Sequence, residues 1–245
     1  MDMVMATAIT ADSFSQIKNE EKNVVMGENR NYKIVNGIKY YVDERKFYSF
    51  IKRTFDIIAA SLFLLLFFWL FVIIAIIIKL QDGGPVFYVS TRVGRYGRRF
   101  NFYKFRSMRV DADKMLDELK SQNETRGELF KMKNDPRVTR FGRILRKTSL
   151  DELPQMFNIL KGDMSFVGPR PPLVREVKNY TEYSMQRLAV TGGLTCYWQI
   201  SGRSQIDFNG MVKLDQKYIQ ERGVLTDLKI LIKTVPAVLK GDGAY

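Results

Sequence analysis

Residues Ile57–Ile78, with the sequence IIAASLFLLLFFWLFVIIAIII, carry no charged side chain and only one hydroxyl group, that of Ser61. A helix of this length rises about 33 Å, which matches the hydrocarbon core of a bilayer. Lys52 and Arg53 precede the segment and Lys79 follows it, as expected where a helix leaves the apolar layer. The segment therefore predicts one membrane helix over residues 51–80.

The course of this helix through the membrane is less well determined by the sequence. Lys and Arg are abundant on both flanks, so the excess of positive charge that marks a cytoplasmic side does not fix an orientation. Basic flanks on both sides also suit a helix that enters and leaves the same leaflet. No Pro or Gly lies inside the segment to break it, so the residues alone slightly favour a straight span.

The segments around the apolar stretch divide the chain into an N-terminal extension, residues 1–50, and a second domain, residues 81–245. Within the extension, Tyr32–Val42 predicts a β-hairpin with Asn36-Gly37 at its turn. In the second domain, Val86–Val89 and Arg99–Phe105 resemble short strands. Helices are expected over residues 111–122, 151–160, 174–188, 206–221 and 226–240. The prediction is a mainly α fold with a small β component.

The last of these helices is amphipathic, with apolar residues on one face and lysines beside them. Most such faces pack into a protein core. Next to a membrane anchor, an interfacial position is the alternative.

Composition narrows the range of functions. The 245-residue chain has a net charge of +13 and a pI near 9.7, which favours anionic partners such as nucleic acid, phosphorylated substrates or acidic lipid. It contains no histidine, which excludes histidine-based triads and metal sites. Cys196 is the only cysteine, so the chain can form neither an intramolecular disulfide nor a cysteine metal cluster.

The stretch Thr148–Gln155, TSLDELPQ, contains the adjacent carboxylates Asp151 and Glu152. A series of bases precedes it and the rigid turn Gly168-Pro-Arg-Pro171 follows it. The preceding bases are Arg137, Arg140, Arg143, Arg146 and Lys147. Arginine forks grip phosphate oxygens, and Mg²⁺ takes one or two carboxylates together with substrate phosphates. The pattern therefore indicates a phosphate site, with a metal as an option.

Helix capping is the simpler interpretation of the same carboxylates. Ser149-x-x-Glu152 fits a capping box, but Pro154 would then fall inside the helix and break a backbone hydrogen bond. With Asp151 as N-cap, Pro154 falls in the first turn, where it is tolerated. From this stretch alone, capping is the favoured reading.

Several strings follow one another along the chain from about Lys52 to its end. In order, they are Lys52-Arg-x-Phe-Asp56, Lys104-Phe-Arg-Ser-Met108, Asp135-Pro-Arg-Val-Thr-Arg-x-Gly142, Ser149-Leu-Asp-Glu-Leu-Pro-Gln155, Asn158-x-Leu-Lys-Gly-Asp-Met-Ser165, Val167-Gly-Pro-Arg-Pro171 and Trp198-Gln-x-Ser-Gly-Arg203. Together these strings resemble one family, the bacterial sugar transferases that act as polyprenyl-phosphate hexose-1-phosphate transferases, also known as monotopic phosphoglycosyl transferases.

The resemblance implies transfer of a sugar 1-phosphate from a UDP-sugar to undecaprenyl phosphate, with release of UMP. In the family this step starts the lipid-linked repeat of a capsule, an exopolysaccharide or an O-antigen of lipopolysaccharide. It also implies a place at the bacterial inner (cytoplasmic) membrane, with a compact catalytic domain facing the cytoplasm and amphipathic helices at the interface. Membrane lipid, the UDP-sugar and undecaprenyl phosphate are the implied partners, and nucleic acid is not among them.

The same resemblance implies roles for individual residues. Asp151 would be the nucleophile that forms an aspartyl-phosphosugar intermediate, and Glu152 would bind Mg²⁺. The expected phosphate contacts are Lys104, Arg137, Arg143, Arg146, Pro169, Arg170 and Arg203. Asp215 and Asp227 would bind a metal or substrate hydroxyls.

Three departures from the family pattern stand in the sequence. Small members carry a Ser-Pro that bends the membrane helix, and Phe68-Trp69 occupies that place here. Pro-Gly-x-Thr-Gly is replaced by Gly192-Gly-Leu-Thr-Cys196, and residues 1–50 are additional to the minimal enzyme. We still expect a re-entrant membrane helix by analogy with the family.

A different class of function is a non-catalytic basic membrane protein that recruits partners or acidic lipid. A membrane-associated nucleic-acid binder is a further alternative, motivated by net charge alone, although no DNA- or RNA-binding motif is present. The identity of the sugar and the oligomeric state, including a homo-oligomer, stay open at this point.

Overall fold

The computed structural model describes residues 32–112, 114–115, 135–202 and 206–240, and helix α2 (Lys46–Asp82) is its longest element. Among the described residues, α2 is the one helix long and apolar enough to cross a membrane. It begins about one turn earlier than the predicted residues 51–80. Gly83 ends it in the left-handed conformation, with φ of 70°, and donates its N–H to the carbonyl of Lys79.

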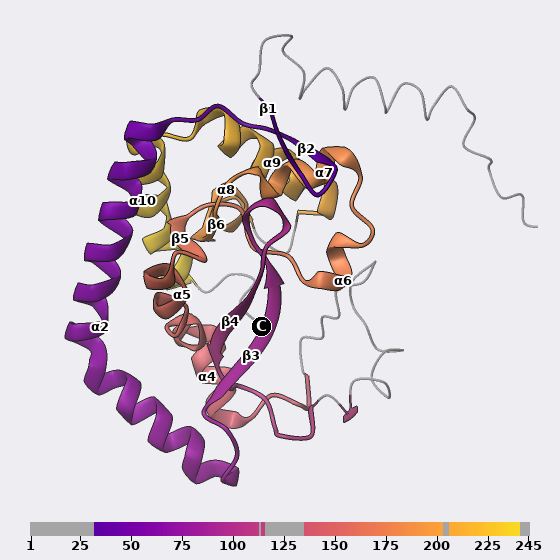
Figure 1. Cartoon of the computed structure of the whole chain (residues 1–245). Coiled ribbons are helices and arrows are strands. Elements are labelled where there is room, and N and C mark those ends of the chain that lie inside the picture. Colours follow the sequence, from indigo (N-terminus) through magenta and orange to yellow (C-terminus); the bar gives the residue numbers. More distant parts are fainter. Residues whose placement is uncertain (1–31, 113, 116–134, 203–205, 241–245) are drawn as a thin grey trace, which may run out of the picture.

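Helix α2 curves around one side of the remaining elements, as Figure 1 shows. Near its start, Lys52 forms an ion pair with Asp227 at 2.5 Å. Near its end, Asp82 accepts a hydrogen bond of 2.8 Å from Arg106. Between these ends, Phe71 packs on Phe105 with their ring centroids 5.3 Å apart. The same domain therefore contacts α2 near both ends and in the middle.

The predicted N-terminal hairpin is confirmed. Strands β1 (Tyr32–Val35) and β2 (Ile38–Tyr41) pair antiparallel around Asn36 and Gly37, whose φ angles of 52° and 78° are those that such a turn requires. The hairpin packs on residue Gln186, whose side chain accepts from the N–H of Tyr41 and donates to the carbonyl of Lys39, both at 2.8 Å. It is thus joined to the second domain.

Two further strand pairs lie close to the site described below. Strands β3 (Phe87–Val93) and β4 (Arg99–Phe105) form the second antiparallel pair, which agrees with the strand patterns expected between residues 86 and 105. They are joined through the 3₁₀ turn η1 (Arg95–Gly97). Strands β5 (Met164–Val167) and β6 (Gly192–Thr195), each four residues long, pair in parallel.

Helices make up most of the remaining chain, so the prediction of a mainly α fold with a small β component is confirmed. The shorter ones are α4 (Arg140–Lys147), η3 (Leu150–Glu152), α5 (Gln155–Lys161), α6 (Val174–Val177), α7 (Glu182–Met185), η4 (Gln186–Ala189) and α8 (Tyr197–Ile200). The chain continues with α9 (Phe208–Glu221) and α10 (Val224–Lys240).

Two helix predictions were wrong in detail. The single helix expected over residues 151–160 is a 3₁₀ turn followed by α5, because Pro154 prevents one continuous helix. The helix expected over residues 174–188 is three short pieces, with Thr181 capping the second of them. Most of the helix expected over residues 111–122 lies outside the described residues.

Three apolar clusters form the core, and two of them place α2 against the elements that carry the candidate site. Ala60 of α2 packs with Phe100 and Phe102 of β4 and with Ile159 of α5. Further along, Phe71, Ile74 and Ile78 of α2 pack with Phe105 and Leu145. The largest cluster joins β2 to α9 and α10 through Tyr40, Tyr218 and Ile230. Helix α2 is therefore packed directly on β4 and α5.

Candidate active site

The two adjacent carboxylates predicted from the sequence meet a single ammonium group. Lys104 on β4 places its Nζ 2.7 Å from Glu152 Oε1 and 3.2 Å from Asp151 Oδ2. Asp151 is 6% exposed, while the side chain of Glu152 is 38% exposed. One carboxylate is thus held inside the protein and the other reaches toward solvent.

The backbone that presents Asp151 is strained. Ser149 takes the left-handed conformation, with φ of 57°, which is uncommon for a residue that is not glycine. It starts the 3₁₀ turn η3, so Asp151 and Glu152 stand in a tight turn before α5. Neither η3 nor α5 has a side-chain cap, because Ser149 makes no capping hydrogen bond and Pro154 precedes α5. The interpretation of Asp151 or Ser149 as an N-cap was therefore wrong.

The surroundings of Asp151 shift the pKa of its carboxyl in opposite directions. Burial raises the pKa of the Asp151 carboxyl, and the positive charge of Lys104 opposes that increase. Glu152 raises the pKa of Asp151 further, while Arg146 lowers it. For Lys104, burial lowers the pKa, but the negative charges of Glu152 and Asp151 outweigh it and hold that pKa above its ordinary value. Lys104 is therefore a fixed cation next to the buried carboxylate.

Arg146 is brought to this turn by an unusually close approach of α4 to the chain leaving β4. A Cβ atom on Gly142 would lie 1.9 Å from the carbonyl oxygen of Ser107, so only glycine fits at this position. Thr139 caps α4 by accepting from the N–H of Gly142 at 2.8 Å. One turn later, Arg146 donates from Nε to Ser107 Oγ at 2.9 Å.

Arg137 is held by a carboxylate of its own. Asp135 accepts from Arg137 Nε at 2.9 Å and from Nη2 at 2.7 Å, and both side chains are buried. Burial raises the pKa of Asp135, but the hydrogen bonds from Arg137 outweigh it and hold that pKa below its usual range. This fork fixes the segment that leads into α4.

The turn Gly168–Pro171 places Arg170 near enough to Lys104 to affect its pKa. Close backbone packing of Gly168 on Gly193 holds this turn in place, since a Cβ on Gly193 would lie 2.1 Å from the Gly168 nitrogen. The N–H of Gly193 also donates to the carbonyl of Pro169 at 2.9 Å. The positive charge of Arg170 opposes the increase in the pKa of Lys104 that Glu152 and Asp151 cause, and its guanidinium lies 5.9 Å from the ring centroid of Trp198.

Asp215 supports the turn Gly168–Pro171 indirectly, through Arg187. It forms a fully buried ion pair with Arg187, with Nε and Oδ2 2.6 Å apart. Arg187 also donates to Tyr180 Oη at 2.6 Å and to the carbonyl of Arg170 at 3.3 Å. Asp215 therefore positions the turn through Arg187 and does not itself face the carboxylates.

Arg92 on β3 belongs to this group of cations, and the sequence did not indicate it. Its Nη1 donates to the carbonyl of Pro171 at 3.1 Å, whereas its buried Nε has no partner among the described residues. Burial, together with the positive charge of Arg170, lowers the pKa of Arg92 to about 10. Arg92 is buried by the pairing of β3 with β4, a long-range feature for which the sequence has no local signal.

The remaining candidates lie elsewhere. Asp227 binds Lys52, Tyr48 and Tyr218, so it holds the start of α2. Arg143 is exposed on α4, and Arg203 lies outside the described residues.

The donors near Asp151 suit a magnesium ion that also binds substrate. Among the described residues, no group of three acidic, His or Cys side chains could hold a metal alone. Mg²⁺ commonly takes only one or two carboxylates and fills its shell with substrate phosphates and water. Glu152, whose side chain is partly exposed beside Asp151, fits that arrangement.

Comparison with known proteins gives consistent matches. Residues 47–241 match the family model described as bacterial sugar transferase. The chain is 48% identical over 207 residues to a galactosyl transferase, CpsE, of Streptococcus agalactiae, which covers 81% of this chain and 45% of that protein. It is 44% identical over 200 residues to an undecaprenyl-phosphate galactose phosphotransferase of Salmonella typhimurium, with 80% and 42% covered.

A shorter relative is matched over most of its own length. The exopolysaccharide production protein ExoY of Rhizobium meliloti is 44% identical over 198 residues, which cover 79% of this chain and 88% of that protein. By contrast, the chain spans less than half the length of the streptococcal and Salmonella proteins.

Proposed function

Because the chain belongs to the bacterial sugar transferase family, we propose that it transfers a sugar 1-phosphate from a UDP-sugar to undecaprenyl phosphate and releases UMP. Relatives named as an undecaprenyl-phosphate galactose phosphotransferase and as a UDP-galactose-lipid carrier transferase support both substrates. The residues Lys104, Asp151 and Glu152, which the family resemblance marked as site residues, lie together in the fold.

The observation that carries the proposal is the setting of Asp151. Asp151 is 6% exposed and makes no helix cap. Lys104 Nζ lies 3.2 Å from its carboxylate, and Arg146 is near enough to affect its pKa. A buried carboxylate in a strained turn costs stability, and this cost is typical of functional sites. A carboxylate nucleophile also suits a chain without histidine.

In the first step, an Asp151 carboxylate oxygen bonds to the sugar-bearing β-phosphorus of the donor. The bond from that phosphorus to the bridging oxygen breaks, and UMP leaves with this oxygen and its electron pair. In the second step, a phosphate oxygen of undecaprenyl phosphate attacks the same phosphorus. The bond to Asp151 breaks, so the carboxylate is regenerated and the lipid carries a diphosphate-linked sugar. Covalent catalysis of this kind divides one difficult displacement into two.

The neighbouring cations make attack by an anion on an anion feasible. Lys104, Arg146, Arg170 and Arg92 provide positive charge that is already in place before the donor binds, which stabilises charge developing on phosphate oxygens. Glu152 would hold Mg²⁺, and the ion would supply Lewis-acid polarisation of the diphosphate when bound. Asp215 and Asp135 act indirectly, through Arg187 and Arg137.

The contacts of α2 support a proposal for its placement in the membrane. A helix that crossed the bilayer would separate its two ends by the membrane, yet Lys52 and Asp82 both bind the same domain. The exposed apolar residues of α2 lie on its outer side, among them Leu62, Leu65, Phe68 and Ile76. We therefore infer that α2 enters and leaves the cytoplasmic leaflet, with the catalytic domain on the cytoplasmic side.

The test is UMP release by the full chain in detergent or nanodiscs with Mg²⁺, undecaprenyl phosphate and a panel of UDP-sugars. The proposal predicts release with one sugar, and loss of release on chelation or in the Asp151→Asn variant. That variant should stay bound to the membrane because Asp151 makes no described contact with α2. If folded, membrane-bound protein releases no UMP with any UDP-sugar, the non-catalytic recruiting role becomes the better account.

A further inference from the structure

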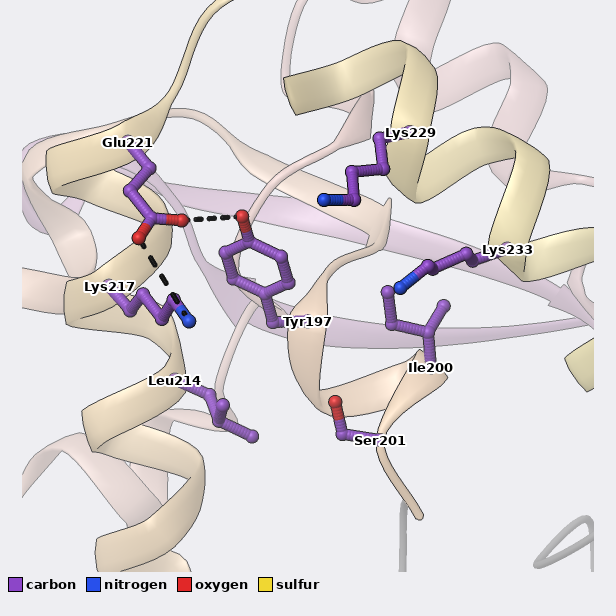
Figure 2. A pocket seen from close by; sticks show the side chains of 8 residues that line it. All are labelled: Tyr197, Ile200, Ser201, Leu214, Lys217, Glu221, Lys229 and Lys233. Carbon is purple, nitrogen blue, oxygen red and sulfur yellow. Dashed lines mark hydrogen bonds and ion pairs between the residues drawn. The ribbon is translucent and has the colours of Figure 1, made fainter. Parts of the chain in front are cut away.

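A hollow of about 410 Å³ lies between α8, α9 and α10, away from the carboxylates of the candidate site. Figure 2 shows its lining: Lys229 and Lys233 from α10 on one side, Lys217 and Glu221 from α9 on the other, with α8 at the base. Lys217 and Glu221 lie 3.9 Å apart. Three ammonium groups thus surround a hollow that contains a single carboxylate.

The carboxylate is already engaged. Tyr197 Oη donates to Glu221 Oε2 at 2.6 Å, and burial together with this bond raises the pKa of Tyr197 to about 12, so the hydroxyl keeps its proton. Lys217 lies over the Tyr197 ring, 5.5 Å from its centroid. In contrast, Lys229 and Lys233 have no ion-pair partner within the part of the chain that the structure describes. These two ammonium groups are available to an anion.

The face of α10 next to these lysines is apolar and uncovered. Leu225 is 82% exposed and Ile232 is 63% exposed, and each is four residues or fewer from a pocket lysine along the helix. The opposite face, with Ile230, packs into the largest apolar cluster. Lysines that border an uncovered apolar face are typical of a helix lying in a membrane interface.

The contact of α10 with α2 sets how deep α10 lies in the membrane. Asp227 accepts hydrogen bonds from Lys52 at 2.5 Å and from Tyr48 at 2.9 Å, and both residues precede the apolar segment that starts at Ile57. Residues just outside such a segment lie among the lipid headgroups. Lys229 follows Asp227 by two residues, so the hollow opens at headgroup level.

We propose that this hollow binds the phosphate group of an acidic phospholipid, with Lys229 and Lys233 as the cations that hold it. The acyl chains would lie along Leu225 and Ile232, and the hydroxyl of Ser201 would be available to the headgroup. The proposal depends on membrane association but not on the transfer reaction.

The test measures lipid binding by the full chain in nonionic detergent, titrated with short-chain phosphatidylglycerol and followed by native mass spectrometry. Wild-type protein should bind about one lipid saturably. Lys229→Gln/Lys233→Gln should bind at least about tenfold more weakly, because each lysine at an acidic surface adds roughly a fivefold preference. Lys229→Arg/Lys233→Arg keeps both charges and should bind like wild type.

A second pair of lysines controls for net charge. Lys178 and Lys213 are exposed and lie outside the hollow, so Lys178→Gln/Lys213→Gln should bind within about twofold of wild type. Equal weakening in the two glutamine pairs would overturn the proposal, since only overall charge would then matter.

The ligands compared in the same assay identify the source of the phosphate. Short-chain phosphatidylcholine and inorganic phosphate should bind at least about tenfold more weakly than phosphatidylglycerol. Equal binding of inorganic phosphate would contradict a lipid site, and displacement by undecaprenyl phosphate would assign the hollow to the acceptor. UMP release, assayed on the same samples, should persist in both glutamine pairs, which separates this proposal from the proposed reaction.

Discussion

Lys104 connects the two carboxylates of the candidate site, and this position separates it from the many other bases of the chain. Its Nζ lies within hydrogen-bonding distance of both Asp151 and Glu152. We predict that Lys104→Met lowers kcat/KM by roughly 10²- to 10³-fold, as expected when a preorganised charge near reacting oxygens is lost. Arg140→Met, which removes an exposed charge from α4, should change the rate less than about threefold. Steady-state UMP release would measure both, and similar losses in the two variants would contradict a special role for Lys104.

The Asp135–Arg137 fork should contribute to stability in a pH-dependent way. The folded-state pKa of Asp135 lies below its ordinary value of about 3.9, so the stabilisation is fully present above about pH 4. It is lost as the pH falls through the folded-state pKa, because the protonated carboxyl no longer pairs with Arg137. Asp135→Asn should cost about 3 kcal/mol at pH 7, since it leaves a buried guanidinium without its ionic partner.

Thermal melting of wild type and Asp135→Asn between pH 7 and pH 3, in the same detergent, would test this assignment. The difference between the two melting temperatures should shrink on acidification. A difference that stays constant down to pH 3 would mean that the carboxylate charge is not what stabilises the pair.

Helix α4 carries Arg146 to the site because a glycine lets it approach the chain leaving β4. We predict that Gly142→Ala destabilises the protein by about 1–3 kcal/mol through overpacking, and lowers activity by displacing Arg146 from Asp151. Gly223→Ala is a matched control, because its added Cβ meets no atom closer than 3.9 Å. Chemical denaturation and UMP release should therefore separate the two variants; equal behaviour would show that α4 has room to move.

The N-terminal hairpin is bound to the part of the chain that matches the family. It precedes residue 47, where the family match begins, yet Gln186 binds two backbone groups of its second strand, β2. The next residue, Arg187, carries the contact to Arg170. One short 3₁₀ element thus joins the additional hairpin to the turn that presents a candidate phosphate ligand.

The molecule as a whole is arranged so that one domain contacts both ends of α2. If α2 is re-entrant, cysteines introduced at Phe47 and Leu80, each 80% exposed, should react with a membrane-impermeant thiol reagent from the same side of sealed vesicles. The native Cys196 is fully buried and should not react in folded protein. Labelling of the two positions from opposite sides would show that α2 crosses the bilayer.

Much of this arrangement could be predicted from local patterns. The length and apolarity of residues 57–78 predicted the membrane helix, and Asn36-Gly37 predicted the first hairpin. Lys104, Asp151 and Glu152, which the family strings marked as site residues, lie together in the fold. Other features depend on long-range packing that no local pattern encodes: the parallel pairing of β5 with β6, the burial of Arg92, and the use of Asp215 and Asp227 as structural anchors.

The most direct test of the central claim is whether the sugar phosphate becomes bound to Asp151. Full-length protein would be mixed with Mg²⁺ and its UDP-sugar but without undecaprenyl phosphate, then analysed by intact mass and peptide mapping. We predict a burst of about one UMP per chain, and a sugar-phosphate adduct on Asp151 that disappears when undecaprenyl phosphate is added. Formation of the lipid product by the Asp151→Asn variant, or turnover without any adduct on Asp151, would contradict the account.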